Sequence, residues 1–221
     1  KVTGNMKFDQ PAAEIDSLAL EFRDRFGISG DVPLIAAAST HEPEEKWLLD
    51  AFNLVWKASG TTLPRLLIAP RHPERFGSVA DTIKRFGFGW ARRSEAASAR
   101  DLNAEVILLD SIGELRSALA LADIVFVGGS LIPHGGQSIL EPAAAGKAII
   151  TGPYTSNFKA AVDEFLKHDA LIQLPECPDS EAAQRLAAAI SQLLDDRTRR
   201  DQIAANAADV MAKNRGAAHK T

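Results

Sequence analysis

Two glycine pairs near the middle of the chain, Gly128-Gly129 and Gly135-Gly136, form a segment suited to binding a phosphorylated ligand. An apolar run at 124–127 precedes them and predicts a buried strand, and a short helix is predicted at 138–145. Glycine lets the backbone approach a ligand closely, and the start of a helix offers free N–H groups that suit an anion. Glu141 in that helix is unsuited to binding an anion, but its carboxylate can accept hydrogen bonds from sugar hydroxyls. The pattern therefore indicates a nucleotide-sugar site.

Both features also have an explanation that needs no ligand. Glycine pairs are common in turns, and Glu141 followed by Pro142 is a favourable acid for the first turn of a helix. Two glycine pairs around Ser130, directly between a strand and a helix, favour ligand binding over simple turns. The loop lacks the lysine of a Walker motif and the G-x-G-x-x-G spacing of a dinucleotide fingerprint, so neither of those sites is predicted.

The elements that position this loop alternate between strand and helix. Apolar runs predict strands at 34–39, 65–69, 88–92, 105–109, 124–127, 148–151 and 171–174. Helices are predicted around 47–56, 78–86, 114–122, 138–145 and 157–167, with two C-terminal helices at 180–194 and 197–214. This alternation predicts an α/β fold with a Rossmann-like parallel sheet covered by helices on both faces.

Polar clusters follow five of the predicted strands at their carboxyl ends, where ligands bind in open parallel sheets. They are Ser39-Thr40-His41, Arg71-His72, 110–114, Gly128-Gly129-Ser130 and 152–157. Because all five fall on one edge of the sheet, we expect a single crevice there.

Two of these clusters have simpler explanations. Ser39 or Thr40 can cap the next helix, with acids in its first turn at Glu42, Glu44 and Glu45. Arg71-His72 can be a surface pair, although the planar fork of arginine suits phosphate or carboxylate.

Composition narrows the classes of function. The net charge of −4 gives no support for nucleic-acid binding as the main activity, and the single cysteine excludes an internal disulfide. No apolar run approaches the roughly 20 residues of a membrane span, and neither a signal peptide nor metal-ligand spacing is visible. The 221 residues suffice for one domain. Because the chain begins at Lys1 rather than at Met, we expect one half of a longer protein.

Motifs along most of the chain resemble the 3-deoxy-D-manno-octulosonic acid (Kdo) transferases, which move Kdo from CMP-Kdo onto a lipid A precursor. They are 3–9 (T-G-N-x-K-F-D), 38–45 (A-S-T-H-x-x-E-E), 70–76 (P-R-H-P-E-R-F), 110–115 (D-x-x-G-E-L), 128–143 (G-G-S-L-x-P-x-G-G-x-x-x-L-E-P-A) and 152–158 (G-P-x-T-x-N-F). The chain departs from the family at Gln137-Ser138, where His-Asn is usual, and at Pro43, where glycine is common.

The resemblance implies the C-terminal, donor-binding half of a two-domain GT-B glycosyltransferase. Residues 1–10 would be a remnant of the interdomain linker, and 11–221 the Rossmann-like domain that binds CMP-Kdo, with C-terminal helices at 180–214. The resemblance also implies that the acceptor site, the membrane-associating segment and the catalytic base lie in an N-terminal half. This chain would then hold no catalytic residue, no metal and no cofactor. The whole protein is expected at the cytoplasmic face of the bacterial inner membrane.

The same resemblance implies which residues bind the donor. In this reading Arg71, Ser130, the loop amides and the helix after Ser39 hold the phosphate, Glu141 holds the ribose hydroxyls and Glu114 contacts the nucleotide. The full predicted set is Ser39, Thr40, His41, Arg71, His72, Glu114, Gly128, Gly129, Ser130, Gly135, Gly136, Gln137, Ser138, Glu141 and Asn157. Two alternatives stay open: another GT-B sugar-nucleotide enzyme, such as a UDP-sugar transferase or epimerase, and a non-catalytic nucleotide-binding module.

Overall fold

A computed structural model describes residues 16–58 and 63–218, and the side chains as far as 214. The predicted linker remnant at 1–10 and the motif at 3–9 lie outside the described residues. Seven parallel strands form one sheet in the order β3-β4-β2-β1-β5-β6-β7. The strands are β1 (Leu34–Thr40), β2 (Arg65–Pro70), β3 (Trp90–Arg92), β4 (Val106–Leu108), β5 (Ile124–Val127), β6 (Ala148–Thr151) and β7 (Ile172–Gln173). The predicted parallel α/β sheet is therefore confirmed.

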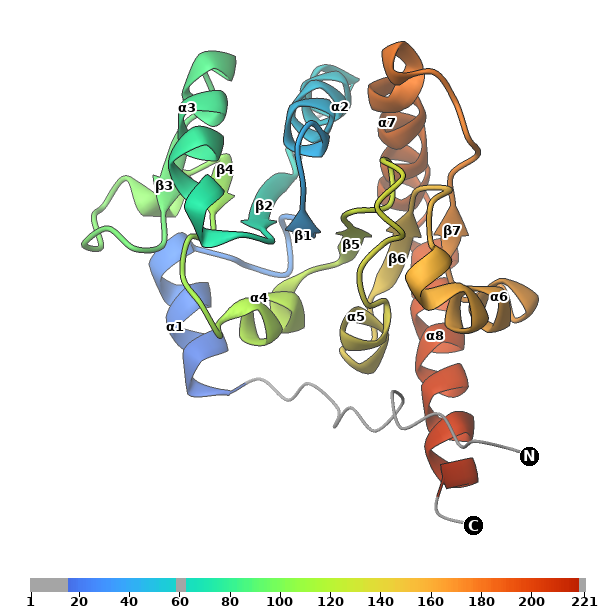
Figure 1. Cartoon of the computed structure of the whole chain (residues 1–221). Coiled ribbons are helices and arrows are strands. Elements are labelled where there is room, and N and C mark those ends of the chain that lie inside the picture. Colours follow the sequence, from blue (N-terminus) through green and yellow to red (C-terminus); the bar gives the residue numbers. More distant parts are fainter. Residues whose placement is uncertain (1–15, 59–62, 219–221) are drawn as a thin grey trace.

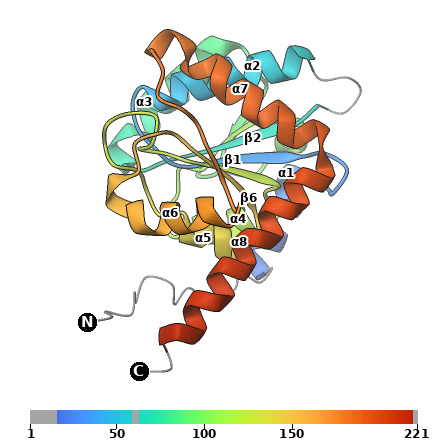
Figure 2. The ribbon, with the colours of Figure 1, turned by 90° about the vertical axis from the view of Figure 1, so that its right-hand side faces the viewer.

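Helices cover both faces of the sheet, as Figures 1 and 2 show. One layer contains α2 (Glu44–Ala58), α3 (Phe76–Phe86) and α7 (Asp179–Asp195). The other contains α1 (Ser17–Phe26), α4 (Leu115–Leu121), α5 (Leu140–Ala144), α6 (Lys159–Lys167) and α8 (Arg197–Ala218). Short 3-10 turns lie at η2 (Pro73–Arg75), η3 (Asp101–Asn103) and η4 (Ser156–Phe158).

Side chains of the central strand β1 pack against the helices on both faces of the sheet. Successive side chains of a strand point to opposite faces, so Ile35 and Ala37 pack beneath α2 and α7, while Leu34 and Ala36 pack against the α1 and α4 side. All four side chains are buried. An unbroken apolar run is what a strand covered on both faces requires.

The first helix, α1, is absent from the helices predicted above, although its ends carry clear signals. The side chain of Asp16 accepts a hydrogen bond from the backbone N–H of Ala19 at 2.7 Å, which caps the first turn. Gly27 ends the helix with φ of 59°. Its apolar face, which includes Phe22 and Phe26, is fully buried.

Two predicted helix starts also differ from the structure. Ser39 and Thr40 belong to β1, and α2 begins only at Glu44, so neither residue caps that helix. The helix expected at 138–145 is the five-residue α5, preceded by a turn in which the hydroxyl of Ser138 accepts the backbone N–H of Leu140 at 3.3 Å.

Candidate functional site

A cavity of about 390 Å³ opens at the carboxyl ends of the central strands. It lies where β1 and β5 meet the loops that lead to α4 and α5. Five of the predicted donor-binding residues line it, namely Ser39, Arg71, Gln137, Ser138 and Glu141. Gly113, Leu115, Arg116 and Leu119 line it as well, and of these only Gly113 belongs to a predicted polar cluster. Three of the five predicted polar clusters therefore contribute to this cavity, through Ser39, Arg71 and Gly113. The clusters at 128–130 and 152–157 do not line it, so the single crevice expected from all five is only partly observed.

Arg71 and Glu141 bring opposite charges to this cavity. Arg71 follows β2, and its backbone N–H donates to the carbonyl of Thr40 at 3.0 Å, which fixes it beside the end of β1. Glu141 lies in α5 and is half-buried. Within the described residues neither side chain forms a hydrogen bond or ion pair, so both can bind a ligand.

Ser39 lines the cavity in a strained backbone conformation. Its φ of 55° is unusual for a residue other than glycine, and the register of β1 against β2 shifts between Ala38 and Thr40. The bulge brings its carbonyl so close to Gly128 that a Cβ added there would lie 2.5 Å from the Ser39 oxygen. Strain of this kind is often found at functional sites. Gly128 is thus required by close packing of the β1 and β5 ends.

The side chains of Thr40 and Ser130 are fully buried and do not line the cavity. The Thr40 hydroxyl donates to a carboxylate oxygen of Glu45 at 2.9 Å. The Ser130 hydroxyl donates to the carbonyl of Val127 and accepts the backbone N–H of Gly152 at 2.8 Å. Both predicted ligand contacts are therefore better explained as bonds that stabilise the strand ends.

The amides of the glycine loop are also already occupied. The carboxylate of Glu44 accepts hydrogen bonds from the backbone N–H groups of Gly129, Ser130 and Leu131, at distances of 2.7 to 3.0 Å. The sequence analysis expected the loop amides to hold a phosphate, but these three already donate to Glu44. Burial raises the pKa of Glu44 above its usual value, and the bonds from the backbone N–H groups offset only part of that rise.

His41 and His72 lie together with His134 beside this loop. The ring centroid of His41 lies 4.3 Å from that of His134 and 5.4 Å from that of His72. Burial lowers the pKa of His41, and the charges of His134 and His72 lower it further. None of the three side chains lines the cavity itself.

Glu114 and Asn157 are held by other residues of the protein. The carboxylate of Glu114 pairs with Arg93 at 2.8 Å and accepts the hydroxyl of Ser111. Burial raises the pKa of Glu114, but the bonds from Arg93 and Ser111 outweigh it and leave that pKa below its usual value. The amide of Asn157 donates to the carbonyl of His134 at 3.1 Å and packs against Gly135, where an added Cβ would lie 2.6 Å from the Asn157 nitrogen. Asn157 thus braces the second glycine pair.

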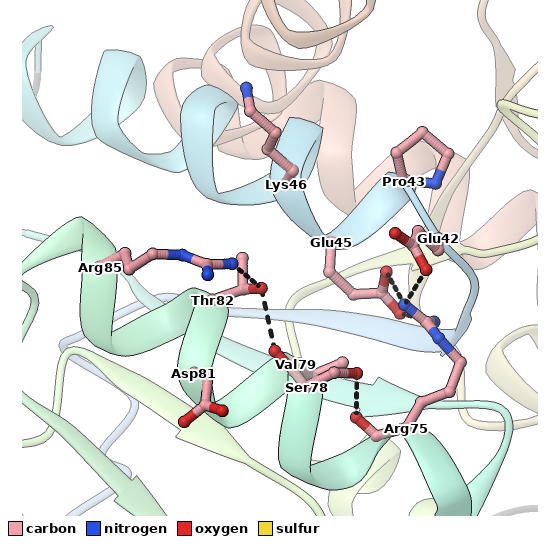
Figure 3. A pocket seen from close by; sticks show the side chains of 10 residues that line it. All are labelled: Glu42, Pro43, Glu45, Lys46, Arg75, Ser78, Val79, Asp81, Thr82 and Arg85. Atoms are coloured by element: carbon pink, nitrogen blue, oxygen red, sulfur yellow. Dashed lines mark hydrogen bonds and ion pairs between the residues drawn. The ribbon is translucent and has the colours of Figure 1, made fainter.

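A second cavity, of about 310 Å³, lies between α2 and α3 (Figure 3). Its most buried charges already pair with each other, because the guanidinium of Arg75 donates to both carboxylate oxygens of Glu45, at 2.5 and 3.1 Å. The cavity at the strand ends offers unpaired charges instead, and we regard it as the candidate site.

The described residues offer neither a metal site nor a membrane-spanning helix. Between 16 and 58 and between 63 and 218, no group of three or more His, Cys, Asp or Glu side chains is arranged to hold a metal ion. None of the helices in these ranges combines the length and apolar character needed to cross a bilayer.

Comparison with known proteins gives consistent matches. A family model described as glycosyl transferases group 1 matches residues 89–210. The 3-deoxy-D-manno-octulosonic acid transferase of Haemophilus influenzae is 35% identical, over 98% of this chain and 48% of the relative. The enzyme of the same name from Bordetella pertussis is 34% identical, over 100% of this chain and 50% of the relative. The chain therefore spans about half the length of these curated relatives.

Among solved structures, the C-terminal CMP-Kdo binding domain of WaaA from Acinetobacter baumannii is similar, with a TM-score of 0.74 and 31% sequence identity. The match covers 87% of this chain and 95% of that domain. The similarity thus extends over nearly the whole of a separately solved domain.

Proposed function

The chain belongs to the glycosyl transferases group 1 family and has the C-terminal domain fold of a GT-B glycosyltransferase, and from this premise we propose that it is the donor-binding half of a Kdo transferase. The whole enzyme would transfer Kdo from CMP-Kdo to a lipid A precursor in lipopolysaccharide biosynthesis. The observation that carries the proposal is the cavity at the strand ends, into which the unpaired Arg71 and Glu141 bring opposite charges. The Kdo transferases among the relatives and the CMP-Kdo binding domain among the structures support this choice of donor.

Different side chains that line the cavity suit different parts of CMP. The carboxylate of Glu141 can accept hydrogen bonds from two ribose hydroxyls. The guanidinium of Arg71 offers a planar fork of donors to the phosphate. The hydroxyl of Ser138 accepts the N–H of Leu140 and keeps its own hydrogen for a ligand, and Gln137 beside it adds an amide.

Transfer breaks the bond between the anomeric carbon of Kdo and the phosphate oxygen, so CMP leaves with added negative charge. A fixed cation where that charge develops lowers the barrier, and Arg71 is placed for this role. The acceptor hydroxyl must lose its proton to a base. We place that base, the acceptor site and the membrane-associating segment in the other half of the enzyme, at the cytoplasmic face of the bacterial inner membrane. No metal, cofactor or nucleic acid takes part in this proposal.

Titration calorimetry of the purified chain with CMP, UMP and UDP tests the donor assignment. We expect weak binding of CMP, because a GT-B donor is held between two domains, and weaker binding of UMP and UDP. Tighter binding of UDP than of CMP would instead indicate a UDP-sugar enzyme of the same fold.

A further inference from the structure

We propose that Glu44 is a positioning residue for the donor site. Its buried carboxylate takes the place of a bound anion among the backbone N–H groups of the glycine loop, and it holds that loop against the ligand cavity. The inference rests on the proposed function, because it concerns how the same cavity keeps its shape. It also implies that the phosphate of the donor is bound by side chains rather than by the first glycine pair.

The contacts of Glu44 form a complete anion site inside the protein. Its side chain is fully buried. One carboxylate oxygen accepts the N–H groups of Gly129 at 2.7 Å and His41 at 2.9 Å. The other accepts those of Ser130 at 3.0 Å and Leu131 at 2.9 Å. Within the described residues no arginine or lysine forms an ion pair with Glu44, so backbone N–H groups alone satisfy its charge.

Capping of α2 accounts for only one of these four bonds. The bond to the N–H of His41 joins residues three apart and resembles the return bond of a capping box. The other three reach residues 85 to 87 positions later in the chain, at the end of β5. Glu44 therefore ties the start of α2 to the glycine loop.

Two peptide groups pass this restraint on to the cavity. The N–H of Gly129 belongs to the same peptide group as the carbonyl of Gly128, which accepts the N–H of Gln137 at 3.1 Å. The N–H of Ser130 belongs with the carbonyl of Gly129, which accepts the N–H of Gly136 at 2.8 Å. Glu44 thus binds one side of each peptide group while the second glycine pair and Gln137 bind the other.

This chain of hydrogen bonds ends at the cavity. Gln137 and its neighbour Ser138 line the cavity. Hydrogen bonds in series polarise one another, so a charged acceptor at one end strengthens the bonds at the other. Loss of the charge at Glu44 should therefore loosen the segment that meets the donor, although Glu44 itself touches no ligand.

A carboxylate is needed here because four donors converge on two oxygens. A glutamine would offer one oxygen, and its NH₂ group would face N–H groups that it cannot satisfy. A neighbouring residue gives a matched control. Glu45 is also nearly fully buried in the first turn of α2, but it accepts from Thr40 and Arg75 rather than from the loop. Figure 3 shows its pairing with Arg75.

The test compares Glu44→Gln with Glu45→Gln by amide hydrogen exchange and by titration with CMP. We expect exchange of the Gly136 and Gln137 amides to quicken in Glu44→Gln, and CMP affinity to fall by about tenfold or more. Glu45→Gln should lose stability yet leave both readouts within about twofold of the wild type. Equal changes in the two variants, or unchanged exchange of the two amides in Glu44→Gln, would overturn the positioning role.

The variant Glu44→Asp gives a second test of the role of Glu44. If Glu44→Gln does not fold, Glu44→Asp retains the charge on a shorter side chain. We expect the aspartate variant to bind CMP more weakly than the wild type, and wild-type affinity in it would overturn the inference. Hydrogen exchange needs no ligand, so quickened exchange in Glu44→Gln combined with no CMP binding by the wild type would refute the donor assignment and leave the role of Glu44 intact.

Discussion

The imidazole ring of His134 lies over that of His41, with their centroids 4.3 Å apart and their planes tilted by 41°. His41 is buried, and its Nδ1 lies 3.2 Å from the carbonyl oxygen of Ser39. A carbonyl only accepts, so Nδ1 carries the hydrogen of the neutral ring and Nε2 is left as an acceptor. That Nε2 is buried and has no hydrogen-bond partner among the described residues. The pair therefore holds a buried histidine that resists protonation beside Gly129 of the glycine loop.

This arrangement predicts a loss of stability in mild acid. Burial lowers the pKa of His41 in the folded protein, and repulsion from His134 and His72 adds to the effect. The unfolded chain then binds more protons than the folded one, so stability falls as the pH drops below the ordinary histidine value of about 6.5. We expect His41 to account for up to about 1.4 kcal/mol of the loss between about pH 7.5 and about pH 5.5.

Urea unfolding of the wild type, His41→Gln and His168→Gln at these two pH values checks this prediction. His168 is an exposed histidine at the end of α6, outside the cluster. The pH-dependent loss should shrink in His41→Gln and persist in His168→Gln. A loss of the same size in all three proteins would show that His41 does not titrate as described.

Glu141→Gln should weaken the binding of CMP with little effect on folding. The carboxylate of Glu141 lines the cavity and supports no other described residue, so the change removes a charged acceptor for ribose hydroxyls at a cost of roughly 1–3 kcal/mol. Calorimetry with CMP and a thermal melt give the two readouts, and Glu181→Gln on the exposed side of α7 is the control. A much lower melting temperature with normal CMP binding would make Glu141 a structural residue.

Gly128→Ala should destabilise the fold and impair the donor site together. The added Cβ would lie 2.5 Å from the carbonyl oxygen of Ser39 and 2.6 Å from the Cα of Thr40, and backbone atoms cannot rotate away. We expect a loss of about 3 kcal/mol in urea unfolding, at the upper end of overpacking effects. Gly77→Ala is the matched control, because nothing lies within 4 Å of its Cβ, and alanine in α3 should be neutral or stabilise by up to about 1 kcal/mol. Equal stabilities of the two variants would contradict the close packing at Gly128.

Local patterns explain why the sheet could be predicted from the sequence. Each buried strand is an apolar run that ends in a polar cluster, as at 34–40 and 124–130, and both signals are local. The cavity residues Ser39 and Arg71 could be predicted from the same pattern, because strand ends gather on one edge of the sheet. Glu141 could be predicted because it lies in the helix that follows the glycine loop. Even α1 carried local signals in Asp16 and Gly27 that would have located it.

Glu44 shows why the rest could not be predicted. In the sequence it is an ordinary acid of the first helical turn, and its loop partners come 85 to 87 residues later. Nothing local distinguishes it from Glu45, which pairs with Arg75. The bulge at Ser39 could not be predicted from the sequence either, since serine has no special preference for positive φ. Ser130 shows the same difficulty in part, because its hydroxyl accepts the N–H of Gly152, 22 residues later in the chain.

Arg71→Ala should weaken both CMP binding and transfer while leaving the fold intact. The side chain of Arg71 is exposed at the mouth of the cavity, so its removal costs little packing. In the full-length enzyme the loss of one fixed donor to the departing phosphate should lower turnover on the order of 10²-fold. Arg100→Ala, another exposed arginine that does not line the cavity, should leave turnover unchanged.

The same assay separates the contributions of the two halves. This chain offers a site for the leaving group, but Glu114 and Glu44 already accept hydrogen bonds inside the protein, and Glu141 is assigned to the ribose. No carboxylate among the candidate donor-site residues is thus left as the base that deprotonates the acceptor hydroxyl. With CMP-Kdo and a lipid A precursor, we expect no transfer by this chain alone and restored transfer when the N-terminal half is present. Transfer by the chain alone would place the base in this domain, and wild-type turnover in full-length Arg71→Ala would remove Arg71 from the phosphate site.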